Sequence, residues 1–304
     1  MARQGAGGRA EASTFTAFGL RAEAEAIAPG LHVVATPIGN LKDISLRALS
    51  TLAAAEAVIA EDTRVTKTLL AHYGIATPLI AYHEHNAQIV RPQILARLEK
   101  GAALALVSDA GTPLVSDPGF KLVAESVAAG FAVTSVPGAS AVLAALVVAG
   151  LPTDRFFFEG FLPQKNAARR ARLAELAAIP GTLVFFESPR RIAETLADCA
   201  SVLGARDAAV ARELTKHFET VRRGPLADLA REIAGTELRG EIVLLVGPPG
   251  EDAQEIGEAD LDARIRAALS ENSVKDAASI VAGETGQPRR RVYARALQLA
   301  GREE

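Results

Sequence analysis

Several features are scarce or missing in this 304-residue sequence. It contains one cysteine, Cys199, and no tryptophan. A single cysteine excludes an intramolecular disulfide and a zinc site built from several cysteines, and it suits the reducing cytoplasm. Long hydrophobic runs are missing too, because the longest, residues 139–150, is far shorter than the roughly 20 apolar residues that span a bilayer. We therefore expect a cytoplasmic protein with no membrane-spanning segment.

A net positive charge is also absent. The sequence has 33 lysines and arginines against 36 aspartates and glutamates, and its pI is near 6.0. Proteins that grip nucleic acid usually carry an excess of basic residues. Any RNA-binding surface must therefore be local, and the residues from Lys275 to Arg302 form the one locally basic segment.

The sequence pattern predicts an α/β protein. Hydrophobic residues make up 49% of the chain, enough for one or two substantial cores. Short β-rich runs alternate with longer helical windows, which is typical of parallel βαβ units. A first series ends near Gly150-Leu151-Pro152, a second ends at Gly247-Pro248-Pro249-Gly250, and three short helices follow. We expect four parts: a flexible N-terminal segment (1–29), an N-terminal α/β domain (30–150), a C-terminal α/β domain (151–250) and a helical extension (251–304).

Three junctions between a predicted strand and a turn stand out. They are Ala35–Leu41, Ser108–Gly119 and Val136–Ala141. In open parallel sheets ligands bind outside the carboxyl ends of the strands, so the three loops are expected to meet there. Pro37 restricts the first turn, and Gly39 allows close approach of a ligand. Alternatively, all three are simply tight turns between a strand and a helix.

The type of ligand is narrowed by what these loops lack. None matches the phosphate-binding GxxxxGK[ST] or a complete GxGxxG, which disfavours a nucleoside triphosphate or NAD. A ligand with little or no phosphate, held by backbone groups and small side chains, remains. A nucleoside such as S-adenosylmethionine fits this description, although physical reasoning alone does not select it.

Seven sequence blocks in fixed order carry a family resemblance. They are Ala35–Leu41, Glu61–Arg64, Tyr82–Asn86, Ser108–Pro113, Val136–Ala141, Phe185–Arg191 and Arg212–Lys216. Together they resemble the bacterial small-subunit ribosomal RNA cytidine 2′-O-methyltransferases of the tetrapyrrole-methylase-like superfamily. The resemblance runs from about Gly30 to Val246, and the last helices resemble that family's helix-turn-helix-like extension.

The resemblance implies a fold, a cofactor and a substrate. The fold has two α/β domains with S-adenosylmethionine in the cleft between them, usually in a homodimer, and the substrate is 16S ribosomal RNA of the small subunit. By analogy, the donor-binding residues of the first domain are Pro37, Gly39, Asp109, Gly111, Thr112, Ser140 and Ala141. Those of the second domain, aligned by pattern only, are Phe186, Ala211 and Ile242.

The acceptor side requires residues that help a ribose hydroxyl attack. Such a hydroxyl is a weak nucleophile, and a nearby base or a local positive field assists it. The candidates are Asp62, Arg64, His85, Glu187 and Lys216. Alternatively, the acids at 61–62 only favour a helix N-terminus. No metal is expected, because no further His or Cys pattern supports the 83–86 loop, and His217 is interpreted as a surface residue.

Arginines supply the candidate RNA contacts. They are Arg190, Arg191, Arg289, Arg290, Arg291 and Arg295. Arginine binds phosphate with two parallel hydrogen bonds, although each of these residues is alternatively a solvated surface charge. A further basic group, Lys165, Arg169, Arg170 and Arg172, is either an RNA-facing surface or a solvated helix face, and the pattern slightly favours the second.

Two other functions compete with RNA methylation. One is methylation of a tetrapyrrole carbon, which would leave the basic C-terminal segment and the Glu61–Arg64 block without a role. The other is a non-enzymatic RNA-binding assembly factor, in which the three loops would have no role. Binding of the methyl donor would distinguish an enzyme from a non-enzymatic assembly factor. The identity of the methyl acceptor would distinguish an RNA methyltransferase from a tetrapyrrole methyltransferase.

Overall fold

A computed structural model describes residues 13–114, 119–250, 258–270, 272–285, 287 and 289–301. Contacts divide the chain into two compact units. Unit 1 comprises Met1–Val148, Ala211–Val221 and Gly240–Val243, and unit 2 comprises Ala149–Val210, Arg222–Arg239 and Leu244–Glu304. The first boundary falls close to the one expected from the sequence. The two later segments that join unit 1 were not anticipated.

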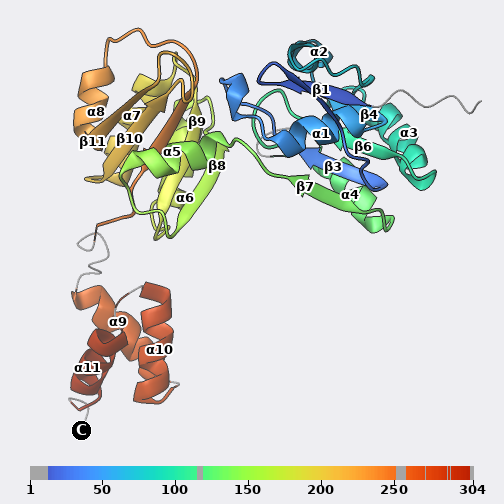
Figure 1. The fold of residues 1–304 in the computed structure, drawn as a ribbon. Helices are drawn as coiled ribbons and strands as arrows, with labels where there is room; N and C mark the ends of the chain where they lie inside the picture. The colour runs from blue at the N-terminus through green and yellow to red at the C-terminus, as the bar shows by residue number, and fades with distance from the viewer. Residues whose placement is uncertain are drawn as a thin grey trace, which may run out of the picture. The chain divides into compact units, whose positions relative to one another are not determined.

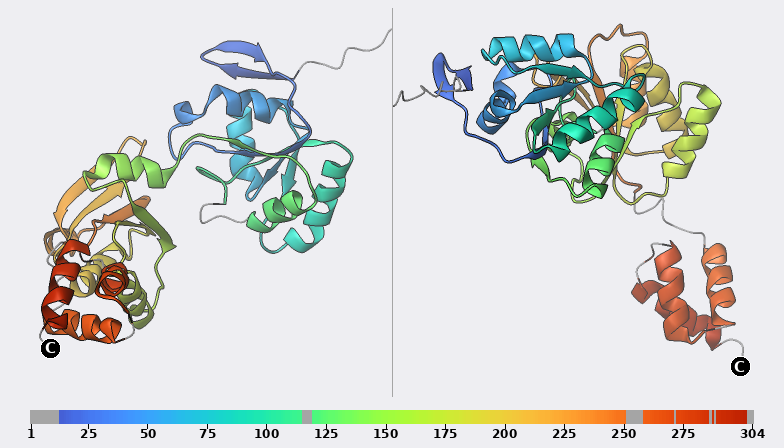
Figure 2. Two further views of the ribbon diagram at one scale, coloured as in Figure 1. Left: turned by 90° about the horizontal axis from the view of Figure 1, so that it is seen from below. Right: turned by 90° about the vertical axis from the view of Figure 1, so that its right-hand side faces the viewer.

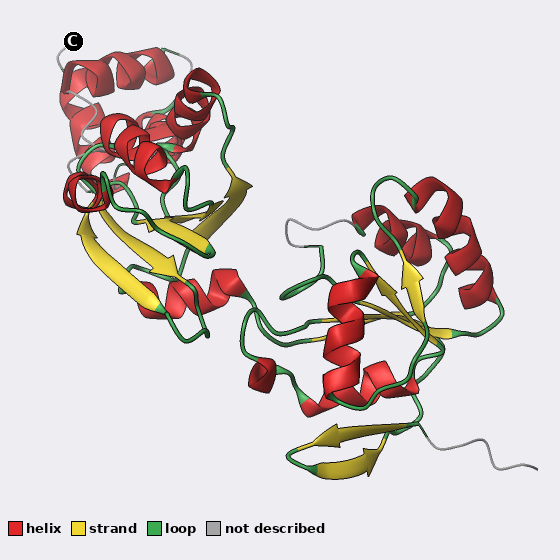
Figure 3. Ribbon diagram, turned by 90° about the horizontal axis from the view of Figure 1, so that it is seen from above, coloured by secondary structure: helices red, strands yellow, loops and turns green. Residues whose placement is uncertain are grey.

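Unit 1 contains a five-stranded parallel sheet of order β5-β4-β6-β3-β7. The strands are β3 (Gly30–Val34), β4 (Ala57–Ala60), β5 (Leu79–Ala81), β6 (Ala103–Leu106) and β7 (Val133–Val136). The connecting helices are α1 (Leu46–Ala54), α2 (Thr63–His72), α3 (Ala87–Glu99) and α4 (Phe120–Ala128), and they flank the sheet in Figure 3. The predicted parallel α/β architecture is confirmed. The sequence did not predict β5, which is only three residues long and not buried.

Neighbouring residues on one strand enter different cores. On β4, Val58 packs into a core with Leu49 and Leu52 of α1, whereas Ile59 packs into a second core with Leu98 of α3. Successive side chains of a strand point to opposite faces, so a strand covered on both faces must be apolar throughout. All four residues of β4 are indeed buried, which explains its uninterrupted apolar run.

An N-terminal hairpin precedes the sheet. Antiparallel strands β1 (Thr14–Ala17) and β2 (Leu20–Glu23) are joined at Phe18 and Gly19, both of which have positive φ as a tight hairpin turn requires. The prediction of a flexible segment was wrong for this part. Phe15 is buried in the core beside α1 and anchors the hairpin, which is the dark blue pair of strands in Figure 2. Residues 1–12 lie outside the described residues.

The second sheet has the order β11-β10-β12-β9-β8. Its strands are β8 (Phe156–Phe161), β9 (Thr182–Glu187), β10 (Asp207–Arg212), β11 (Thr220–Pro225) and β12 (Ile242–Val246). Helices α6 (Asn166–Leu176), α7 (Ile192–Leu203) and α8 (Leu226–Ile233) belong to unit 2, whereas α5 (Ala141–Ala149) belongs to unit 1 except for its last residue; all four are labelled in Figure 1. All of these elements except β11 were predicted. The β11 sequence contains two arginines and a glycine and therefore lacks an apolar run.

Three arginines of the predicted basic group on α6 bind carboxylates. Arg169 is only 1% exposed, and its Nε donates to Asp198 at 2.6 Å. Arg170 also donates to Asp198, while Arg172 pairs with Glu159. Both interpretations of this group were wrong for Arg169, because its guanidinium is buried against the Asp198 carboxylate.

Three C-terminal helices form a small unit with its own core. They are α9 (Glu258–Leu269), α10 (Val274–Thr285) and α11 (Arg289–Ala300), and each contributes buried apolar residues to the core, including Ile265, Val281 and Val292. Ser273 caps the start of α10, because its Oγ accepts from Asp276 N and donates to the Asp276 carboxylate. Pro288 lies outside the described residues. Among those described, no helix is both long enough and apolar enough to cross a membrane.

Candidate functional site

The three loops that follow β3, β6 and β7 converge as predicted. Thr36 and Gly111 exchange backbone hydrogen bonds of 2.9 and 3.0 Å, which ties the first loop to the second. Thr112 Oγ1 donates to the carbonyl of Ala139 at 3.1 Å, which ties the second to the third. Three turns separated by up to about a hundred residues of sequence therefore form one junction at the carboxyl end of the sheet.

Two glycines in this junction have a structural reason. Gly111 has a φ of 81°, in a region that L side chains rarely adopt, and a Cβ there would lie 3.2 Å from Ile38 Cγ2. At Gly39, with a φ of 157°, a Cβ would lie 2.5 Å from Cγ of Lys216. Gly39 is therefore the surface on which the Lys216 side chain lies.

A cavity of about 440 Å³ opens beside the junction. Its lining is Thr36, Pro37, Ile38, Gly39, Leu41, Val65, Thr66, Thr68, Leu69, Ser108, Asp109, Ala110, Lys216 and Glu241. Four of these are predicted site residues: Pro37, Gly39, Asp109 and Lys216. No sequence motif pointed to Glu241 or to the α2 residues. Glu241 starts an apolar run, and on α2 only the tertiary packing distinguishes the cavity side from any other face.

Lys216 is fixed at the cavity by two carboxylates. Its Nζ donates to Glu213 at 2.9 Å and to Glu241 at 3.0 Å. Partial burial alone would lower the pKa of Lys216, but these hydrogen bonds outweigh it and raise the pKa above its ordinary value. The hydrogen bond from Lys216 in turn holds the pKa of Glu213 below its usual range. At neutral pH Lys216 is therefore protonated and Glu213 is ionised.

Asp62 and Arg64 form a local pair at the start of α2. Asp62 is the N-cap and accepts from Arg64 N at 2.8 Å, and its carboxylate pairs with the guanidinium at 2.6 Å. The side-chain and backbone hydrogen bonds from Arg64 lower the pKa of Asp62 to about 2. Asp109 Oδ1 accepts from Asp62 N at 3.1 Å and so links this helix start to the cavity. Asp62 therefore caps the helix, and it is too weak a base to remove a hydroxyl proton.

A second, small cavity of about 30 Å³ adjoins Ile38 and Glu241. Its other lining residues are Ala141, Ala211, Leu214 and Val243. Ala141 and Ala211 are thus predicted donor residues that the fold brings together. Ile242 is buried and does not line this cavity. The residues on either side of it in the chain, Glu241 and Val243, do line the cavity, because successive side chains along an extended chain point in opposite directions. Ser140 lies just before α5, and its Oγ accepts from Leu143 N at 3.5 Å.

His85 lies in an exposed turn after β5. Its ring centroid is 6.0 Å from that of His83, and Asn86 closes the turn by accepting from His83 N. Among the described residues, no group of three or more His, Cys, Asp or Glu side chains is placed to hold a metal ion.

Two predicted site residues belong to unit 2. Glu187 is buried, and its oxygens accept from Ser188 N and Thr195 Oγ1, both at 2.7 Å. The Phe186 ring packs edge-on against Phe158, with centroids 4.9 Å apart. Both oxygens of the Glu187 carboxylate therefore already accept a hydrogen bond from residues of unit 2.

The candidate RNA-binding arginines differ in how far they are engaged. Arg190 is exposed, and so are the first three residues of α11, Arg289, Arg290 and Arg291, of which Arg291 also donates to Gln287 Oε1 at 2.9 Å. Arg191 instead donates to the carbonyls of Leu162 and Pro163. Arg295 makes two hydrogen bonds to Asp262, of 2.6 and 2.7 Å. Arg191 and Arg295 therefore hold their own domains together.

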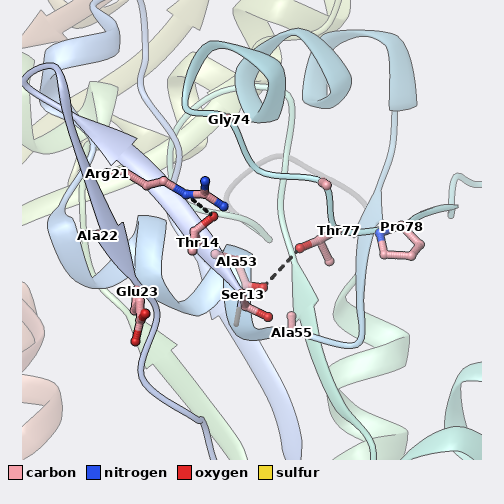
Figure 4. Close-up of a pocket in the computed structure, with 11 residues that line it drawn as sticks. Ser13, Thr14, Arg21, Ala22, Glu23, Ala53, Ala55, Gly74, Thr77 and Pro78 are labelled. Atoms are coloured by element: carbon pink, nitrogen blue, oxygen red, sulfur yellow. Dashed lines mark hydrogen bonds between the residues drawn. The ribbon is translucent and has the colours of Figure 1, made fainter. Parts of the chain in front are cut away.

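Another hollow, of about 840 Å³, lies beneath the N-terminal hairpin (Figure 4). Arg21, which donates to Thr14, and Glu23 line it together with Thr77 and Pro78. None of the predicted site residues contributes to its lining. It is a gap between the hairpin and the sheet domain, separate from the junction of the three loops.

The chain is similar to known methyltransferases in both sequence and fold. Residues 30–230 match the family model of tetrapyrrole (corrin/porphyrin) methylases, and residues 255–300 match that of the RsmI C-terminal HTH domain. The chain is similar to ribosomal RNA small subunit methyltransferase I of Mesorhizobium japonicum (51% identity, 91% of this chain and 94% of the relative) and of Pseudomonas aeruginosa (49%, 90% and 98%). Its fold is similar to that of uroporphyrin-III C-methyl transferase from Thermus thermophilus complexed with S-adenyl homocysteine (TM-score 0.50, 20% identity, 72% of this chain and 97% of that chain).

Proposed function

This chain belongs to the tetrapyrrole (corrin/porphyrin) methylase family, among its ribosomal RNA small subunit methyltransferases, and on that premise we propose that it methylates the ribose 2′-oxygen of a cytidine in 16S ribosomal RNA. The methyl donor is S-adenosylmethionine. The observation that carries the proposal is the junction of three loops with a fixed ammonium, Lys216, at its cavity. Such a site combines a place for a small ligand with a charge suited to a nucleic acid.

The junction fits the donor. When bound, the donor supplies an electrophilic methyl group on a sulfonium. A volume of about 440 Å³ lies in the range of small-molecule sites, and the lining is mostly apolar and small. Asp109 and Glu241 provide negative charge for a cationic ligand, and Gly39 and Gly111 keep the loops free of bulk. We assign donor binding to Pro37, Gly39, Asp109, Gly111, Thr112, Ser140, Ala141 and Ala211.

Lys216 is assigned to the acceptor. A protonated amine beside the 2′-oxygen stabilises the negative charge that grows as the hydroxyl loses its proton. Glu213, which accepts a hydrogen bond from Lys216, and Asp62, at the start of α2, are poor bases because the pKa of each is lowered. We assign proton acceptance to His85, because an imidazole nitrogen within reach of the hydroxyl can act as a general base.

The RNA contacts are assigned to the exposed arginines. Arg190 and the run Arg289–Arg291 have side chains at the surface, where they can neutralise phosphates. The substrate we propose is 16S ribosomal RNA within the small ribosomal subunit, which places the reaction in the cytoplasm. The chain's overall negative charge requires that binding depend on this local segment.

A labelled methyl donor tests the function. Incubation with immature small-subunit particles is expected to place label on a ribose 2′-oxygen of 16S RNA. Lys216→Met is expected to lower kcat by about 100-fold, the loss typical of removing one charge-stabilising donor. Lys216→Arg should recover part of the rate, and Lys100→Met, at an exposed lysine after α3, should change nothing. RNA that stays unlabelled across several assembly states would refute the proposal.

We also propose a homodimer, on the evidence of an exposed aromatic edge. β8 is the last strand of its sheet, and Phe156, Phe157 and Phe161 on it are 45%, 36% and 59% exposed. An apolar edge strand is a common site of association. Phe161→Glu is expected to convert a dimer into a monomer in light scattering. A dimer that survives this substitution would move the interface elsewhere.

A further inference from the structure

Lys216 lies where two consecutive tight turns meet. The amide of Lys216 donates to the carbonyl of Glu213 at 3.0 Å, and the amide of Glu219 donates to the carbonyl of Lys216 at 3.2 Å. Each bond closes a four-residue turn, so Lys216 ends the first turn and begins the second. Leu214, in the first turn, is buried and lines the small cavity beside Ile38. The first turn is therefore anchored in the domain.

The second turn displays an aromatic pair. Its two central residues are His217 and Phe218, both exposed, and their ring centroids are 4.8 Å apart. Phe218 is 67% exposed. A single exposed phenylalanine is ordinary on a protein surface. This one differs because it lies two residues from the ammonium that lines the candidate active-site cavity.

The loop that carries the ring is held rigidly. Arg212 donates to the carbonyl of Phe218 at 3.1 Å and to Thr220 Oγ1 at 3.2 Å, and Glu219 accepts from Thr215 N at 2.6 Å. Glu213 and Thr215 have φ values of 52° and 66°, a conformation that non-glycine residues seldom adopt. Such strain persists only where the surroundings enforce it, and it concentrates at functional sites. In this strained conformation the loop holds Lys216 and Phe218 close together.

We propose that Phe218, edged by His217, is a stacking platform for an unpaired base of the acceptor RNA next to the ribose that Lys216 serves. Sequence-specific RNA recognition uses splayed-out bases that stack on aromatic side chains. An A-form duplex displays its 2′-hydroxyls in the minor groove, but a stacked nucleotide cannot enter a recessed site unless it leaves the stack. A platform outside the cavity would hold the neighbouring base once the strand has opened there. The inference rests on the proposed function, because it takes RNA as the occupant.

The absence of tryptophan makes a direct test possible. Phe218→Trp introduces the chain's single tryptophan, and its fluorescence should be quenched when protein-free transcribed 16S RNA is added. The control is Phe18→Trp at the hairpin tip, where the parent side chain is 90% exposed, and its fluorescence should not change. Equal responses of the two reporters, or none at residue 218 under conditions where the RNA binds, would overturn the inference.

Kinetics provide the second test. Phe218→Ala and Phe218→Leu are expected to lower kcat/KM for small-subunit particles by about 10- to 100-fold, the loss of one base–aromatic stack, while Phe218→Trp stays active. Donor affinity measured by calorimetry should not change. Full activity of the leucine variant would indicate apolar packing and contradict stacking. A change of oligomeric state in the alanine variant would instead assign the ring to a second copy of this chain.

The two proposals fail in different ways. If the unmodified protein never labels RNA, the proposed methyl transfer is wrong, yet quenching at position 218 still reports a stacked base. If RNA is labelled and the position 218 variants behave like the parent protein, only the stacking platform is wrong.

Discussion

At the scale of single residues, Arg169 was expected at the surface but forms a buried ion pair with Asp198. Arg169 and Asp198 are both buried, and the carboxylate also accepts hydrogen bonds from Arg170 and Asn166. Removing one partner leaves the other charge buried and unpaired. We expect Arg169→Met to lower the free energy of unfolding by about 3 to 5 kcal/mol, as measured by urea denaturation. A loss no larger than that of a surface substitution would show that water reaches the pair.

The same pair predicts a pH dependence. Burial alone would raise the pKa of Asp198, but the hydrogen bonds from Arg169 and Arg170 outweigh it and lower the pKa. A carboxylate with a lowered pKa in the folded state contributes stability above its unfolded pKa of about 3.9, and that contribution is lost as the pH falls through the folded pKa. Urea midpoints should therefore fall below about pH 4. In Asp198→Asn, part of this acid sensitivity should be missing.

At the scale of elements, the hairpin β1–β2 shows how one residue attaches a segment. Phe15 is its buried anchor, and Thr16 N donates to the Tyr73 carbonyl at 2.7 Å. Phe15→Ala is expected to cost about 3 kcal/mol of stability. Phe18→Ala at the exposed tip should cost close to nothing, which makes it a matched control for the same residue type. Equal effects in denaturation of the full chain would contradict the anchoring role.

At the scale of the whole molecule, the C-terminal helices carry local positive charge in an acidic chain. Arg289, Arg290 and Arg291 are exposed, whereas Arg295 is occupied by Asp262. Replacing the three exposed arginines with glutamine should weaken RNA binding and reduce the salt slope by about 0.7 for each arginine that contacts a phosphate. Donor affinity should stay the same. An unchanged salt slope in filter-binding assays would show that this helix end does not contact the RNA.

Local sequence pattern determined the α/β architecture, most helix and strand positions, and the three loops that meet at the sheet edge. Each of these features depends on residues that are close in sequence. The buried strand β4, for example, is a run of four consecutive apolar residues. Parallel connections then bring the carboxyl ends of the strands to the same edge of the sheet. Family motifs added the identity of the candidate residues, including Lys216.

Tertiary structure alone decided which charges are free and which are bound. Arg169 and Arg295 are alike in sequence, yet Arg169 is buried against Asp198, and Arg295 is joined to Asp262 thirty-three positions away. Glu241 likewise reaches Lys216 only after two distant segments fold together. The partner of a charged side chain depends on distances between elements, and a linear pattern contains no such distances.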